Sequence, residues 1–265
     1  MTLPTSLPWM DSVDTKLSRA REHLATLESE VAVYLEAVRS KRTIILKLNA
    51  DQTAVKLMTW LTDSEPPPLR ISAIVGDCVY NTRAALDNLV CSLVRMGRPR
   101  STCAGRSFPV VARIEDWTTS TLRGIPAKAK TRIRDLQPFN RPPASVDVDP
   151  LSVLNTLRNM DTHRAALLTS GFSRNTRFAI HLKDGRVVFV TPGRPLFGES
   201  FDEIPLPFPP SLLEEQTRVE AVGTGVLAFR NEGPWRDRPI VDVVGSCLRY
   251  VEDAIGTFRP FFAQP

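Results

Sequence analysis

The stretch from Ile71 to Val94 (ISAIVGDCVYNTRAALDNLVCSLV) constrains the fold of this chain more than any other. Its only charged residues are Asp77, Arg83 and Asp87. A helix that meets water along one face usually carries several long charged side chains there. The sequence therefore predicts a helix that is buried on most sides.

Three faces of this predicted helix follow from the helical period. One face is broad and apolar, and it contains Ile71, Ile74, Val75, Cys78, Thr82, Ala85, Leu86, Leu89 and Leu93. A second face contains Asp77, Asn81, Ala84 and Asn88. Arg83 and Asp87 lie on a third face, at a spacing where opposite charges pair. Buried polar groups need partners, so other parts of the chain must supply them.

Three more long helices are predicted around this one, which spans about 67–97. They cover about 11–40, 150–170 and 239–262. In the first, apolar residues recur at spacings of four and three: Val13, Leu17, Ala20, Leu24, Leu27, Val31, Tyr34 and Val38. Such a seam is typical of a helix that packs lengthwise against other helices.

The helix predicted over 150–170 carries a charged pair within its apolar stripe. Asp161 and Arg164 fall at the centre of that stripe. A charge in an apolar seam is costly unless it is matched. We therefore expect this helix to pack on the central one and to share a buried polar network with it. The predicted network contains Asp77, Asn81, Arg83, Asp87, Asp161 and Arg164.

The strands are expected in β-hairpins at about 42–61, 177–191 and 217–230. Asp184-Gly185 is a strong two-residue turn signal for the second hairpin. A short strand at 107–111 and short helices at 114–123 and 127–136 are also predicted. Because helices come first, between and last, a parallel βαβ sheet is not expected. The predicted fold is one α+β domain over 1–265, with four long helices forming a bundle-like core and antiparallel β-hairpins packed on or beside it.

Composition sets wide limits on function. A net charge of +5 and a pI of about 9.2 permit contact with nucleic acid without arguing for it. No C-x-x-C or Cys/His cluster occurs, so we expect reduced, buried thiols and no metal or cofactor. Cys78 and Cys91 share one predicted helix at a distance too great for a disulfide. No apolar run could span a bilayer and the start of the sequence lacks a signal-peptide pattern, so we expect a cytoplasmic protein without a membrane partner.

Three motifs along the chain resemble those of a known family. They are Gly76-Asp77-x3-Asn81-x-Arg83-x2-Leu86-Asp87, then Leu136-Gln137-Pro138-Phe139, then Asp161-x-His163-Arg164. The pattern resembles a family of uncharacterised bacterial and phage proteins and covers most of the chain, from near Trp9 to the last helix. That family has no established activity, so the resemblance implies an architecture more than a chemistry. Where the family often has His after Leu-Asp, this chain has Asn88.

A second, weaker resemblance concerns Arg158-Asn159-x3-His163, which is similar to the signature of HEPN-type ribonucleases. Those enzymes are small helical bundles that usually dimerise. The resemblance implies His163 as general acid or base, Arg158 as the group that stabilises charge on phosphate, and Asn159 as the orienting residue. RNA and a second copy of the chain would be the partners, and no metal would be needed. On an ideal helix, however, Arg158 and His163 point about 140° apart.

Two functions from different classes follow from these patterns. The favoured one is a non-catalytic interaction or regulatory protein, as in phage–host conflict, with His163 hydrogen-bonded beside the Asp161–Arg164 pair. The alternative is a metal-independent HEPN-like ribonuclease that acts as a homodimer. The sequence contains no G-x-S-x-G, P-loop or H-E-x-x-H motif. It does not decide whether the protein is an enzyme.

Overall fold

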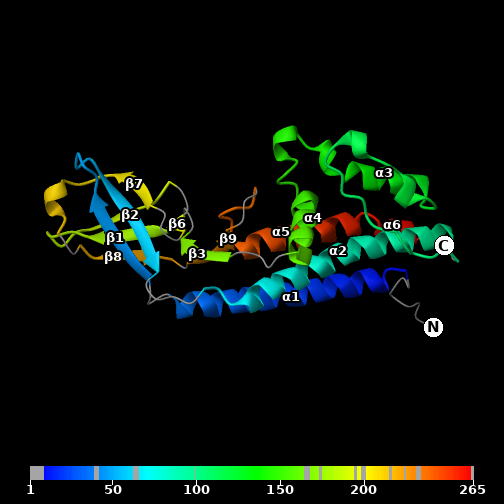
Figure 1. The fold of residues 1–265 in the computed structure, drawn as a ribbon, viewed down its shortest axis with the longest axis horizontal. Coiled ribbons are helices and arrows are strands. Elements are labelled where there is room, and N and C mark those ends of the chain that lie inside the picture. The colour runs from blue at the N-terminus through cyan, green and yellow to red at the C-terminus, as the bar shows by residue number, and fades with distance from the viewer. Residues whose placement is uncertain are drawn as a thin grey trace.

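A computed structural model describes most of the 265-residue chain. The described residues are 9–38, 42–61, 66–98, 100–163, 168–172, 175–193, 196–197, 201–214, 217–223, 225–230 and 234–263. The fold is α+β, as predicted. The described part is elongated, with most strands at one end and the helices at the other (Figure 1).

The helices include four long ones close to their predicted positions. They are α1 (Asp11–Ala37), α2 (Leu69–Gly97), α4 (Pro150–His163) and α5 (Ile240–Gly256). Two shorter helices are α3 (Ala127–Asp135) and α6 (Arg259–Phe262). Short 3-10 turns lie at Ile114–Asp116, Ser120–Leu122, Pro138–Asn140, Pro143–Ser145 and Pro210–Leu212.

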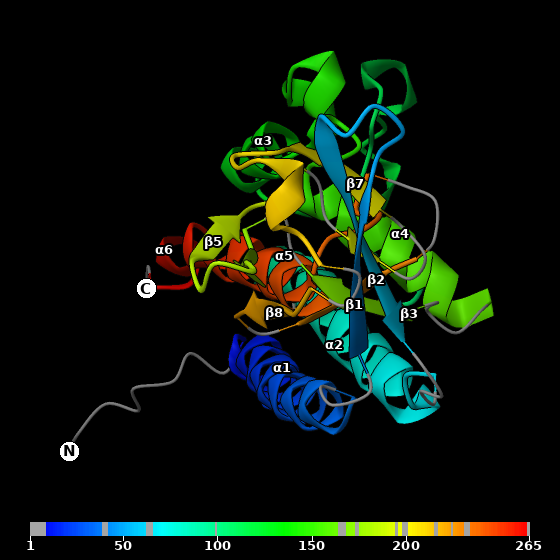
Figure 2. The ribbon, with the colours of Figure 1, turned by 90° about the vertical axis from the view of Figure 1, so that its left-hand side faces the viewer.

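Helices α1, α2 and α5 pack together, with α1 lying lengthwise against α2 (Figures 1 and 2). The predicted seam of α1 is buried at Val13, Leu17, Ala20, Leu27, Val31 and Tyr34. Helix α2 is buried on most sides, as the shortage of charged residues predicted. Helix α4 packs against α2 and α5. The bundle-like core therefore follows from the heptad spacing of α1 and the apolar character of α2.

The strands are β1 (Arg42–Leu48), β2 (Ala54–Leu61), β3 (Leu168–Phe172), β4 (Arg177–His181), β5 (Val187–Val190), β6 (Leu196–Phe197), β7 (Phe201–Pro205), β8 (Val219–Val222) and β9 (Val226–Phe229). Within the described ranges they form three antiparallel sheets with the orders β1-β2-β7, β5-β4-β8 and β6-β3-β9. The hairpins predicted at 42–61 and 177–191 are confirmed.

The apolar residues that the structure describes form two separate cores. The larger core is mainly helical, and the smaller one lies between β1-β2-β7 and β5-β4-β8 around Leu57, Phe178 and Ile180. The third sheet joins them, because β9 contributes Leu227 and Phe229 to the helical core while β3 and β6 contribute Phe172 and Leu196 to the other. The sheet β6-β3-β9 therefore connects the helical and β parts.

Several predicted elements are wrong in detail. The helix expected over 150–170 ends at His163, and β3 begins at Leu168 because Leu-Thr-Ser-Gly-Phe pairs with β6 and β9. The hairpin expected at 217–230 does not form, since β8 and β9 belong to different sheets. Residues 107–111 form no strand, and 114–123 contains two 3-10 turns. The last helix is broken between α5 and α6, just before Pro260.

The expectation of four reduced thiols is also wrong. Cys91 in α2 and Cys103 in the following loop form a disulfide, with 5.4 Å between their Cα atoms. Cys78 and Cys247 are free and buried. Sequence reasoning tested only the Cys78–Cys91 pair on one helix and overlooked that the loop after Gly97 folds back. Among the described helices, none has the length and apolar character that a membrane crossing requires.

Candidate functional site

The paired charges of α2 hold a neighbouring loop in place. The Nη2 atom of Arg83 lies 3.3 Å from Oδ1 of Asp87 and also donates a hydrogen bond to the carbonyl of Phe108. The N–H of Phe108 donates to the same Asp87 oxygen at 2.8 Å. Both backbone groups of Phe108, whose ring is buried, are thus satisfied by one ion pair. The pairing predicted from the spacing of Arg83 and Asp87 forms, and its contacts are structural.

Arg83 is a buried cation, only 4% exposed. Burial lowers the pKa of its guanidinium, Asp87 opposes this, and the charge of Arg158 on α4 lowers it further. Its Nε and Nη1 atoms are buried without a hydrogen-bond partner. Two guanidinium groups, on α2 and α4, are therefore close enough for their charges to interact.

The second polar face of α2 is directed toward α1 and not toward α4. The side chain of Asn81 accepts a hydrogen bond from Nζ of Lys16 at 3.1 Å and donates to the carbonyl of Asp77 at 2.8 Å. Asn88 donates to the carbonyl of Ser12 at 3.2 Å. Asp77 is exposed, so its assignment to a buried network is wrong. Asp77 lies one turn before Asn81, but its side chain faces solvent whereas that of Asn81 is buried.

The proposed catalytic residues lie at the end of α4. Arg158 is half-buried and Asn159 is exposed. His163 is the last residue of the helix. The side chains of Asp161 and His163, and all of Arg164, lie outside the described residues. The Asp161–Arg164 pair and the convergence of Arg158 with His163 therefore stay predictions.

Gln137, the middle residue of the Leu-Gln-Pro turn, is fully buried and structural. Its Oε1 accepts from the N–H of Val111 at 3.0 Å, and its Nε2 donates to the carbonyl of Ile133 at 2.9 Å. Asp149 plays a similar part at the start of α4, where it accepts from the N–H of Leu151 and from Nε of Arg141, each at 2.9 Å. Its place just before Pro150 is a helix-start signal that sequence reasoning had not used.

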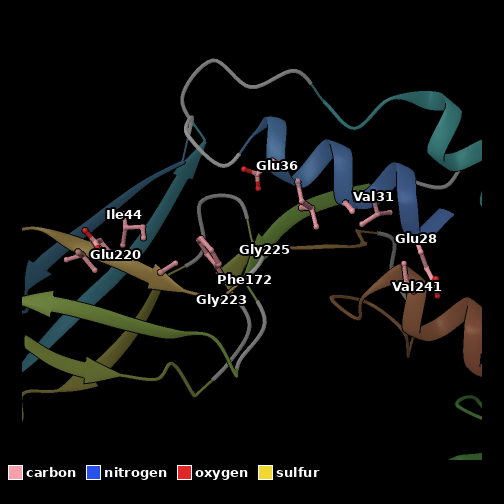
Figure 3. A pocket seen from close by; sticks show the side chains of 13 residues that line it. Glu28, Val31, Glu36, Ile44, Phe172, Glu220, Gly223, Gly225 and Val241 are labelled. Atoms are coloured by element: carbon pink, nitrogen blue, oxygen red, sulfur yellow. The ribbon is translucent and has the colours of Figure 1, made fainter. Parts of the chain in front are cut away.

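A pocket of about 1070 Å³ lies where the helical part meets the β part (Figure 3). We call it the junction pocket. Helices α1 and α5, strands β1, β3 and β8, and the β8–β9 connection contribute to its walls. The lining residues are Glu28, Val31, Ala32, Leu35, Glu36, Ile44, Phe172, Val219, Glu220, Ala221, Gly223, Gly225 and Val241.

The walls of the junction pocket combine apolar residues with three carboxylates. Glu28 and Glu36 come from α1 and Glu220 from β8. Glu220 forms an ion pair with Arg218 and has an oxygen 3.7 Å from Nε2 of His181. No Ser, Thr, Cys, His, Lys or Arg occurs among the described lining residues. This lining suits the binding of an apolar molecule, with carboxylates as its charged groups.

Sequence reasoning did not predict the junction pocket, because its lining comes from segments far apart in the chain. The one local signal is on α1, where Glu28 and Leu35 lie at helical spacing on either side of the seam residue Val31. Metal chemistry has no support in the described residues, which hold no group of three His, Cys, Asp or Glu side chains suited to a metal ion.

Comparisons with known proteins add no identification. No family model, curated protein or solved structure matches the chain.

Proposed function

We propose that this chain is a non-catalytic regulatory protein that binds an apolar ligand in the junction pocket. One observation carries the proposal: the pocket is lined from both apolar cores. Val31 belongs to the helical core and Phe172 to the β core. A ligand between them would hold the helical part and the β part in one arrangement. A partner protein that binds this arrangement would then distinguish the ligand-bound protein from the free one.

The polar residues of the motif-bearing helix favour a non-catalytic role. Arg83 and Asp87 are bonded to the backbone of Phe108, and Asn81 and Asn88 are bonded to α1. Such contacts fix the positions of packed elements.

Binding of the neutral dye Nile red tests the proposal. Ala32 lines the pocket, and replacing it with Trp would fill space without changing the core. Val33 is the matched control, because it is 67% exposed and does not line the pocket. We expect saturable dye fluorescence with the parent protein and Val33→Trp, and at least tenfold weaker binding with Ala32→Trp, about 1.4 kcal/mol. No binding, or equal binding by all three proteins, would refute the proposal.

A HEPN-like ribonuclease, acting as a homodimer on RNA, is the second candidate. What favours it is the basic side chain of Arg158, half-buried on α4 next to the exposed Asn159. An arginine side chain suits the binding of a phosphate. Purified protein should then degrade RNA in the presence of EDTA, and His163→Ala should abolish this without lowering the melting temperature. RNA that stays intact under these conditions would exclude this candidate.

A further inference from the structure

We propose that the ligand of the junction pocket is an apolar amine, meaning a hydrocarbon or aromatic body that carries an ammonium group. This inference rests on the proposed function, since it names the chemical class that the same pocket would take. It depends on the kind and placement of the charged residues that line the pocket.

The body of the ligand must be apolar because most of the lining is. Val31 and Leu35 of α1, Ile44 of β1, Phe172 of β3 and Val241 of α5 supply aliphatic and aromatic surface. Transfer of an apolar group from water to such walls is favourable in proportion to the area buried. The volume of about 1070 Å³ is at the upper end of the range for small-molecule sites.

The charge of the ligand follows from the three carboxylates. Glu28 and Glu36 lie on one face of α1, separated by about two turns, with apolar lining residues between them. Glu220 lies across the pocket on β8. Figure 3 shows Glu28 and Val241 toward one end of the pocket and Ile44 and Glu220 toward the other, with Phe172 between. An elongated ligand would therefore have a carboxylate near each end.

The preference for a cation belongs to the junction pocket and not to the chain as a whole. The chain as a whole carries a net charge of +5, so its overall field favours anions. In the junction pocket the sign is reversed, because no described lining residue is cationic. An anionic ligand there would lose water and meet carboxylates, whereas an ammonium group would gain charge-assisted hydrogen bonds. Arg218 offsets part of the charge of Glu220, so we expect the selectivity for a cation to come mainly from Glu28 of α1.

The test compares three ligands that share a chain length and differ in charge. Decylamine, decanoate and decanol, each below its micelle-forming concentration, compete with bound Nile red on the full-length protein near neutral pH. We expect decylamine to bind about two- to fivefold more tightly than decanoate, the range for a solvent-accessible ion pair. Decanol gives the apolar contribution alone. Added salt should weaken the binding of decylamine and leave the binding of decanol unchanged.

Glu28→Gln and Glu22→Gln form the matched pair of variants. Both residues are exposed on α1, and only Glu28 lines the pocket. We expect Glu28→Gln to weaken decylamine about two- to fivefold, with no change for decanol. Glu22→Gln removes one charge from the same helix, in an exposed pair with Arg19, and should leave both affinities unchanged.

The outcomes separate the inference from the function on which it rests. If Nile red binds but decanoate competes as well as decylamine, the pocket binds ligands and the inferred amine is wrong. An equal loss of decylamine affinity in both variants would also overturn it. If Nile red does not bind, the proposed function fails, and the amine inference fails with it.

Discussion

Asp87 and Arg83 meet on either side of the backbone of Phe108: the carboxylate accepts its N–H at 2.8 Å, and the guanidinium donates to its carbonyl. The two side chains also lie 3.3 Å apart, one turn from each other on α2. One ion pair thus ties the central helix to the loop that follows it. The charge of Arg158 lowers the pKa of Arg83 and that of Asp87 opposes this, so Asp87 helps to keep the buried guanidinium charged.

Asp87→Ala should destabilise the protein by about 3 kcal/mol, because it leaves a buried guanidinium and one buried N–H without their acceptor. Urea unfolding followed by circular dichroism measures this change. Asp116→Ala is the control, since it removes an aspartate that pairs with an arginine nearby in the sequence, Arg113, with both side chains exposed. The control should cost at most about 1 kcal/mol. Similar losses in the two variants would show that Asp87 has no structural role.

Gln137→Ala should cost about 1–3 kcal/mol, because the amide N–H of Val111 would lose its acceptor inside the protein. Asn140→Ala is a suitable comparison. Its side chain makes one hydrogen bond, to the carbonyl of Arg134, in an exposed position. We expect a loss below about 1 kcal/mol there, measured by the same urea unfolding. A larger loss in Asn140→Ala than in Gln137→Ala would contradict the role given to Gln137.

Reduction of the Cys91–Cys103 disulfide should lower the melting temperature. Closing a loop of this length restricts the unfolded chain, and its loss costs about 2–3 kcal/mol. Thermal unfolding with and without dithiothreitol measures the difference. A Cys91→Ala/Cys103→Ala variant should melt like the reduced parent and should not respond to dithiothreitol. A parent that melts equally in both conditions would show that the bond is absent or does not contribute.

The two free thiols should be unreactive in the native protein. Burial raises the pKa of Cys78 and of Cys247 from 9.0 to about 12, so neither forms the reactive thiolate near neutral pH. Without reductant, a thiol reagent such as DTNB at pH 8 should detect almost no thiol until the protein is unfolded, and two afterwards. The unfolded thiols ionise near pH 9 and the native ones near 12, so stability should fall as pH rises through that window. Fast native reaction would contradict this burial.

The helical part was largely predictable because its signals are local. The spacing from Val13 to Val38 and the missing charges of α2 depend only on neighbouring residues, and the structure follows both. The hairpin at Asp184-Gly185 was predictable for the same reason. The pairing of strands into sheets, in contrast, does not depend on neighbouring residues alone. Nothing in the residues near Gly223 indicates that β8 pairs with β4 while β9 pairs with β3.

The candidate site was harder to predict than the fold. The exposed position of Asp77 depends on which face of α2 meets α1, and its spacing from Asn81 does not reveal this. The junction pocket arises only when α1, α5 and the two sheets come together. Its residues Val31 and Phe172 look like ordinary core positions in the sequence. A pocket that forms between two cores has no sequence motif from which it could be predicted.

Hydrogen–deuterium exchange of the full chain, with and without saturating Nile red, tests the central claim most directly. Ligand bound in the junction pocket should slow exchange of amides in 28–36 of α1 and in Val219–Val222 of β8, the segments that line it. Amides of α3, which contributes no residue to the pocket, should exchange at unchanged rates. Protection confined to α3, or no protection anywhere at saturation, would contradict the claim that this pocket is the binding site.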